Sequence, residues 1–200
     1  MLLDNARNFL QDYFCTDFDK WSAHDKLVPA GWEPMHAIGV VNLARLLECP
    51  SVLPIALAVC CTLGGSVVIG YERRDGTWET LSSADVERCV CASQELARGT
   101  TATFCHALVM SESDQLCAGC PDPKACAGKM RRLLVSYASG AQERDLFGDK
   151  HPFRDVRYYF GVRLNNSGVC TECKVLVKER FVAKQKELWD RLPGMMGVTV

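Results

Sequence analysis

The sequence predicts a mainly α-helical protein: an antiparallel array of about six to eight helices, with a cysteine-tied C-terminal block and little or no β structure. Apolar residues recur at three- and four-residue spacing through most of the 200 residues, which is the helical period. The stretches between them are short and rich in Pro and Gly. A hydrophobic fraction of 48% and a charged fraction of 24% are ordinary for a globular domain with a real core.

Three helices are expected in the first third of the chain. The first covers residues 2–14, an amphipathic stretch, and the second covers about residues 35–47. Ser51 is the expected N-cap of a third helix over residues 52–63, because Pro54 then falls in the first turn, where proline is tolerated. Since the connection is very short, the second and third helices should form a hairpin at the centre of the core.

The next segment, VVIGYERRDGTWETL at residues 67–81, has two interpretations. It is either a β-hairpin that turns at Asp75-Gly76 or a loop with one helical turn. The loop is the preferred interpretation.

A good helix start follows this segment. Ser82 is placed as an N-cap with Asp85 three residues later, and Leu81 and Val86 stand in hydrophobic-staple positions. This helix should run to about Ala97, and a separate helix should cover residues 103–109.

The C-terminal half contains two clear helices, over residues 123–138 and about 171–192. The stretch between them, DLFGDKHPFRDVRYYFGVRLNNSG at residues 145–168, is expected to be irregular with at most one short strand or turn. A boundary near residues 110–116 divides the chain into a helical block, 1–112, and a cysteine-tied helical block, 113–200, that packs on the first as one unit.

Composition and charge argue against several classes of protein. A net charge of -1 gives no basic surface for nucleic acid. The longest apolar run, LPIALAVCCTLGGSVVIG, is broken by Gly-Gly and indicates a buried helix and a turn, so no membrane contact is expected. The N-terminus lacks the features of a secretory signal, which predicts an intracellular protein, cytoplasmic or nuclear, whose thiols stay free or bind metal.

The chain has 12 cysteines, and five of them form a pattern. These are Cys117, Cys120 and Cys126 in CAGCPDPKAC, and Cys170 and Cys173 in CTEC. The favoured interpretation is a structural metal site, with one structural zinc as the cofactor, that fastens the start of the 123–138 helix to the start of the last helix. Plain packing as small buried hydrophobes and redox chemistry remain the alternatives.

The remaining chemistry-bearing residues show no catalytic pattern. Seven cysteines are expected to be buried hydrophobes: Cys15, Cys49, Cys60, Cys61, Cys89, Cys91 and Cys105. The four histidines are dispersed, and no spacing suggests a nucleophile and its base. The lysines of the last helix alternate with glutamates, which is typical of a solvated face, with a basic recognition helix as the alternative.

Several blocks of the sequence together resemble one family. They are AIGVVNLARLLECPSVLPIALAVCC, GTWETLSSADVERCV, the C-x5-C and C-x2-C pairs, and ELWDRLPGMMGV. In order and spacing they look like the region that follows the BTB/POZ domain in basidiomycete fungal BTB proteins, from about Phe14 to Val198. The cysteines that match the family pattern are Cys120, Cys126, Cys170 and Cys173, whereas Cys117 falls outside it and is the alternative ligand.

This resemblance implies a BACK-like helical segment of a protein-interaction protein and not an enzyme. Related BTB proteins dimerise, and act as adaptors of cullin-type ubiquitin ligases or as transcriptional cofactors. The mixed α/β BTB fold itself is not among the 200 residues, so the resemblance does not extend to contacts made through it. Protein partners are therefore expected, with homo-oligomerisation left open. A zinc-stabilised nucleic-acid-binding regulator is the alternative function, and a thiol oxidoreductase is the third.

Overall fold

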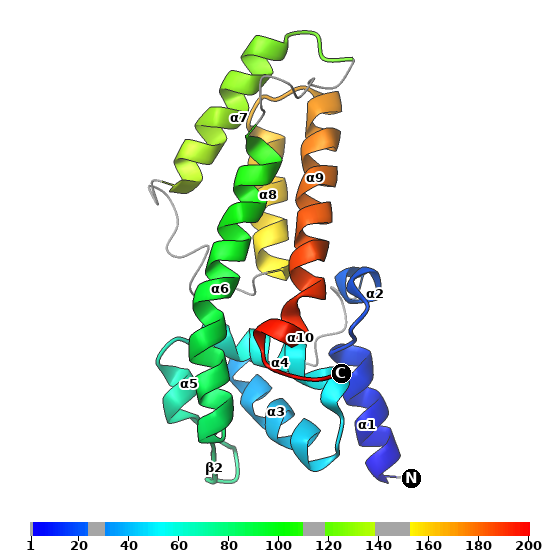
Figure 1. Cartoon of the computed structure of the whole chain (residues 1–200), viewed down its shortest axis with the longest axis vertical. Coiled ribbons are helices and arrows are strands. Elements are labelled where there is room, and N and C mark those ends of the chain that lie inside the picture. Colours follow the sequence, from blue (N-terminus) through cyan, green and yellow to red (C-terminus); the bar gives the residue numbers. More distant parts are fainter. Residues whose placement is uncertain (1, 24–30, 110–118, 139–152) are drawn as a thin grey trace. The chain divides into compact units, whose positions relative to one another are not determined.

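The computed structural model describes residues 2–23, 31–109, 119–138 and 153–200. Within these ranges the chain forms α-helices numbered α1 to α10, three 3₁₀ turns and one two-stranded sheet (Figure 1). The prediction of a mainly α-helical fold with little β structure is therefore confirmed.

The chain divides into two compact units, Met1–Leu96 with Trp189–Val200, and Ala97–Leu188. The helix α6 begins in the first unit and continues into the second, and α9 begins in the second and ends in the first. The block boundary expected near residues 110–116 lies outside the described residues, and the division into 1–112 and 113–200 stays a prediction. Among the helices of the described ranges, none has the length and apolar content that crossing a membrane requires.

The first unit is built from short helices and one small sheet. Its elements in chain order are α1 (Leu2–Tyr13), α2 (Phe18–Ala23), η1 (Pro34–His36), α3 (Ala37–Leu46), η2 (Pro50–Val52), α4 (Leu53–Cys60), η3 (Cys61–Leu63), α5 (Ser66–Ile69), β1 (Tyr71–Glu72), β2 (Trp78–Glu79), the start of α6 (Ser83–Leu108) and α10 (Leu192–Met195). All eight residues of α4 are buried, and α4 packs against α3. The predicted hairpin at the centre of the core is thus present.

The expected N-cap at Ser51 is wrong. Pro50 begins the 3₁₀ turn η2, and α4 starts only at Leu53, with Val52 in the capping position and no side-chain cap. Because Pro50 fixes φ and lacks an N–H, it suits the first position of this turn and moves the helix start beyond Ser51.

The preference for a loop at residues 67–81 is also wrong, because β1 and β2 pair as an antiparallel hairpin. Gly76 takes φ +81, which glycine adopts without strain, and its N–H donates to the Arg73 carbonyl at 2.9 Å. Asp75 Oδ1 accepts the Thr77 N–H at 3.0 Å. The Asp-Gly turn thus specifies a β-hairpin even though each strand has only two residues.

The predicted break between two helices at residues 98–102 is absent, because α6 runs unbroken from Ser83 to Leu108. Its start is as expected: Ser82 Oγ accepts the Asp85 N–H at 3.2 Å. The helix continues through the Gly-Thr-Thr stretch at residues 99–101, where the hydroxyls of Thr101 and Thr103 donate to carbonyls one turn back, both at 2.9 Å.

The second unit consists of the end of α6 with α7 (Pro123–Ala138), α8 (Arg154–Asn166) and most of α9 (Thr171–Asp190). The helices expected at 123–138 and near 171–192 are confirmed. The irregular structure expected at 145–168 is wrong over Arg154–Asn166, because Phe160 and Leu164 on α8 are buried in the core of this unit. Residues 145–152 lie outside the described ranges.

Aromatic rings fill the middle of this core. Phe160 of α8 stacks on Phe181 of α9 with ring centroids 4.1 Å apart. Phe104 of α6 meets Phe181 edge to face at 5.4 Å, and it contacts the tilted ring of Tyr137 of α7 at 4.5 Å. All four helices therefore contribute to one apolar core, and the cysteine cluster lies at its border.

Candidate metal centre

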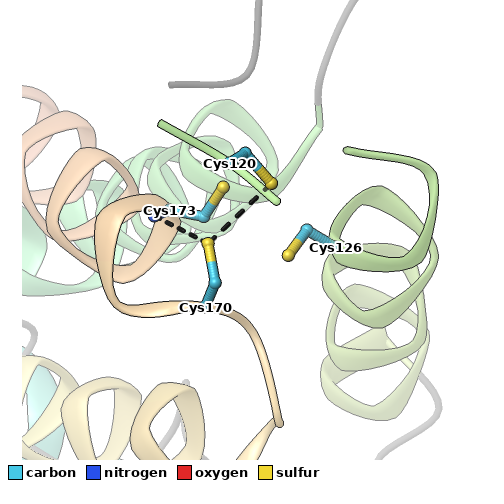
Figure 2. A group of neighbouring side chains, drawn as sticks. All are labelled: Cys120, Cys126, Cys170 and Cys173. Atoms are coloured by element: carbon cyan, nitrogen blue, oxygen red, sulfur yellow. Dashed lines mark hydrogen bonds between the residues drawn. The ribbon is translucent and has the colours of Figure 1, made fainter. Parts of the chain in front are cut away.

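Four of the five patterned cysteines come together in the second unit. Figure 2 shows the side chains of Cys120, Cys126, Cys170 and Cys173 with their sulfur atoms pointing toward one another. All four Sγ atoms lie within 4.8 Å of one another, close enough to hold one metal ion. The ligand role itself stays a prediction, and the alternative ligand Cys117 lies outside the described residues.

The first pair is placed by the start of α7. Asp122 Oδ1 accepts the Ala125 N–H at 3.0 Å, which is an N-cap, and Pro123 occupies the first helical position. Cys126 follows in the first turn, and its N–H donates to the Asp122 carbonyl at 3.0 Å. Cys120 precedes the cap in a short non-helical stretch with a bend at Pro121. The Pro-Asp-Pro sequence therefore starts the helix and orients Cys126.

The second pair is placed by the turn between α8 and α9. Gly168 takes φ +73, which ends α8, and Val169 is buried directly after it. Cys170 then stands before the first residue of α9, where its Sγ accepts the Cys173 N–H at 3.5 Å. Cys170 thus acts as an N-cap through sulfur, and Cys173 lies in the first turn of the same helix.

Two lysines hold the backbone around the second pair. Lys129 of α7 donates from Nζ to the Gly168 carbonyl at 2.6 Å, and Lys174 of α9 donates to the Asn165 carbonyl at 2.8 Å. These carbonyls belong to the C-terminal end of α8 and lack partners within the helix. The lysines therefore fix the turn that presents Cys170.

The cluster is partly inside the core. Cys126 and Cys173 are buried, and each continues an apolar stripe along its helix, whereas Cys120 and Cys170 are half-buried. On α7 the stripe runs from Cys126 through Met130 and Leu133, at spacings of four and three residues. Among the described residues, the set that could hold a metal consists of these four cysteines, with no histidine or carboxylate.

The thiols perturb one another. The backbone N–H of Cys170 donates to the Cys126 sulfur and holds the pKa of that thiol below its ordinary value, against the opposing effect of desolvation. The Cys173 N–H likewise favours the thiolate of Cys170, but desolvation and the hydrogen bonds that Cys170 makes with Cys126 and Cys120 raise its pKa to about 11. Within the cluster, the pKa of Cys126 is thus lowered and that of Cys170 is raised.

A disulfide does not account for the geometry. Every cysteine of the described ranges is free. The Sγ atoms of Cys170 and Cys120 are 3.8 Å apart, which is hydrogen-bonding distance and far beyond the about 2.05 Å of a disulfide. The arrangement brings four separate sulfur donors to one point.

The other seven cysteines lie outside this cluster. Cys49, Cys60 and Cys89 are buried, as expected, and Cys15, Cys61 and Cys105 are half-buried. Cys91 is exposed, so the expectation of burial is wrong there. Two residues along a helix turn the side chain by about 200°, and with Cys89 facing the core Cys91 faces away.

Some of the residues that support the site can be recognised from the sequence, and others cannot. The Asp-Pro start of α7 is a recognisable N-cap and first-position pair, so Asp122 could be found from its spacing. The contact of Lys129 with Gly168 spans 39 residues and has no local signal.

Comparison of the chain with protein-family models, with curated proteins and with solved structures gives no significant match.

Proposed function

We propose that this chain is a non-enzymatic protein-interaction module whose second unit is closed by one structural zinc ion, held by Cys120, Cys126, Cys170 and Cys173. The observation that carries the zinc is the convergence of four sulfur atoms within 4.8 Å of one another. Zinc–sulfur bonds of about 2.3 Å place the sulfurs of a regular tetrahedron about 3.8 Å apart. The distance between Cys170 and Cys120 sulfurs is 3.8 Å.

The electrostatic surroundings favour the charged form of the site. Four thiolates around Zn²⁺ carry a net charge of about −2, and such a charge is stabilised at helix N-termini. Cys126 lies in the first turn of α7, and Cys170 and Cys173 lie at the start of α9. Two helix N-termini therefore face the same small anionic centre.

The role of this ion is structural. A four-cysteine set fills the tetrahedral coordination of zinc and leaves no open position for water or substrate. It joins the starts of α7 and α9, which are separated by more than forty positions in the sequence. An ion of this kind supports a fold, which agrees with the interaction role that the resemblance to post-BTB regions implies.

Elemental analysis of protein purified without added metal tests the proposal. We expect one zinc per chain in the wild type and in Cys60→Ser, and a loss of zinc in Cys173→Ser. Cys60 is a matched control, because both residues are 0% exposed and Cys60 lies in the other unit. Wild-type protein that holds iron in place of zinc, or no metal after incubation with zinc, would contradict the proposed site.

A further inference from the structure

The first unit has an open groove between α1, α3 and the β-hairpin. It has a volume of about 530 Å³. All of its lining residues belong to the first unit, and none belongs to the cysteine cluster. Its two ends differ in character: the part between α1 and α3 is apolar, and the part beside the hairpin is polar.

Large apolar side chains stand exposed along the apolar part. Phe9 of α1 is 50% exposed, and Leu46 of α3 is 78% exposed. Leu43, one turn before Leu46, lines the groove as well and is also partly exposed. Contiguous exposed apolar residues that line a groove are typical of an interaction site.

The polar part presents the guanidinium of Arg73 to solvent. Glu79 accepts hydrogen bonds from Asn42 Nδ2 at 2.6 Å and from Arg73 Nη1 at 3.2 Å, so Glu79 and Arg73 form an ion pair without net charge. The side chain of Glu79 is 17% exposed, but that of Arg73 is 52% exposed. A guanidinium has five N–H donors, which leaves Arg73 able to bind a further carboxylate from solvent.

We propose that this groove binds an amphipathic helix of a partner protein that carries an acidic residue at the end facing Arg73. The inference rests on the proposed interaction role and specifies its surface. From Gly39 to Leu46 the lining of α3 extends about 10 Å, which matches two turns of a bound helix. Apolar side chains at helical spacing would cover Phe9 and Leu46, the mode in which helices lie in apolar grooves.

A helix fits these features better than a small molecule. The exposed apolar side chains of the lining, Phe9 of α1 with Leu43 and Leu46 of α3, are spread along two helices. The polar atoms of Asn42 and Glu79 are engaged with each other and with the hairpin, so they do not converge on a point inside the groove. An extended apolar stripe with a guanidinium at one end calls for an extended amphipathic ligand.

Selection of a displayed library of random 16-residue peptides on the 200-residue protein, purified and incubated with zinc, tests this proposal. Enriched peptides should carry apolar residues at helical spacing together with Asp or Glu. Leu46→Glu should weaken their binding at least tenfold, whereas Val68→Glu should leave it unchanged, because Val68 is 62% exposed on α5 and does not line the groove. Circular dichroism would establish that both variants are folded.

The role of Arg73 is tested by one change in the protein and one in the peptide. Arg73→Gln should weaken an acidic peptide roughly threefold to tenfold, and should not weaken the same peptide with its Asp or Glu replaced by the amide. Absence of enriched peptides, peptides that bind Leu46→Glu as well as wild type, or equal effects of Arg73→Gln on both peptides would overturn the proposal. So would a dimer in light scattering that Leu46→Glu converts to a monomer, since a second copy would then occupy the groove.

These outcomes are separate from the test of zinc. A protein with one zinc per chain that fails to select peptides refutes the groove alone. A protein without zinc that still binds the selected peptides refutes the metal site alone. Peptides that bind but ignore Leu46→Glu preserve the interaction role and move it to another surface.

Discussion

Replacement of Cys173 by serine separates the contribution of the metal from that of burial. Cys173 is 0% exposed, and it packs within the core of the second unit. A buried serine hydroxyl in its place costs about 1–3 kcal/mol of stability whether or not metal is present. Cys60→Ser, at another position with 0% exposure, should carry a similar cost.

The zinc-dependent part follows from linkage. Free zinc at 1,000 times its Kd stabilises the folded protein by about 4.1 kcal/mol. Loss of one of the four ligands should lower the affinity for zinc by more than 10- to 100-fold, which is the effect of losing a residue that only supports a ligand. A 100-fold loss reduces the stabilisation by about 2.7 kcal/mol, which corresponds to about 5–11 °C in Tm for a chain of this size.

The assay is thermal unfolding of wild type, Cys173→Ser and Cys60→Ser, each with zinc and with a chelator. With zinc, Cys173→Ser should melt about 5–11 °C below Cys60→Ser. With the chelator, the two variants should melt within a few degrees of each other, and wild type and Cys60→Ser should both lose stability. An equal gap between the two variants under both conditions would refute the role of Cys173 as a ligand.

Three other changes test interactions inside the first unit or inside the second. Burial raises the pKa of Asp85, but the hydrogen bonds from Arg45 and Ser82 and the charges of Arg45 and Arg88 together outweigh it and hold that pKa below the ordinary value of 3.8. The stability it contributes is thus present above about pH 4 and lost as the pH falls through the lower value. Asp85→Asn should cost about 1–3 kcal/mol in urea unfolding at pH 7, and the cost should fall as the pH is lowered below 3.8; a cost that does not change with pH would contradict this. Gly70→Ala should unfold the hairpin region in hydrogen exchange, because Gly70 has φ +83 and a Cβ there would overlap the Glu79 carbonyl oxygen; unchanged protection would be the contrary result. Phe160→Ala should lower the free energy of unfolding by about 3–5 kcal/mol, since the ring is 1% exposed; a loss below about 1 kcal/mol would show that the aromatic core is not formed as described.

Elements with strong local signals could be predicted from the sequence. The helix at residues 123–138 has an N-cap, a proline in its first position and a clear apolar stripe, and the structure has α7 over Pro123–Ala138. The start of α6 was likewise predictable, because Ser82 and Asp85 form their contacts within one turn. Local hydrogen bonds and the helical period determine such elements without help from distant residues.

Elements that depend on distant contacts could not be predicted in the same way. Helix α8 contains Gly161 and several Asn, Tyr and Arg residues, and its helical form rests on the burial of Phe160 and Leu164 against other helices. The continuity of α6 through Gly99 has a similar origin, because Leu188 occupies the space that a side chain there would take. Tertiary packing outweighs local propensity in both places.

The candidate site was only partly predictable. Spacing identified five cysteines for four positions, and the structure brings together Cys120, Cys126, Cys170 and Cys173. The groove on the first unit had no sequence signal, because its walls come from α1, α3 and a hairpin for which a loop was preferred. Exposed Leu46 and Phe9 resemble ordinary members of amphipathic stripes until their helices are placed side by side.

Zinc K-edge X-ray absorption of the purified protein tests the central claim most directly. The account predicts one zinc with four sulfur neighbours at about 2.3 Å and no nitrogen or oxygen neighbour. A spectrum with fewer than four sulfurs, with nitrogen or oxygen ligands, or without a zinc edge would contradict it.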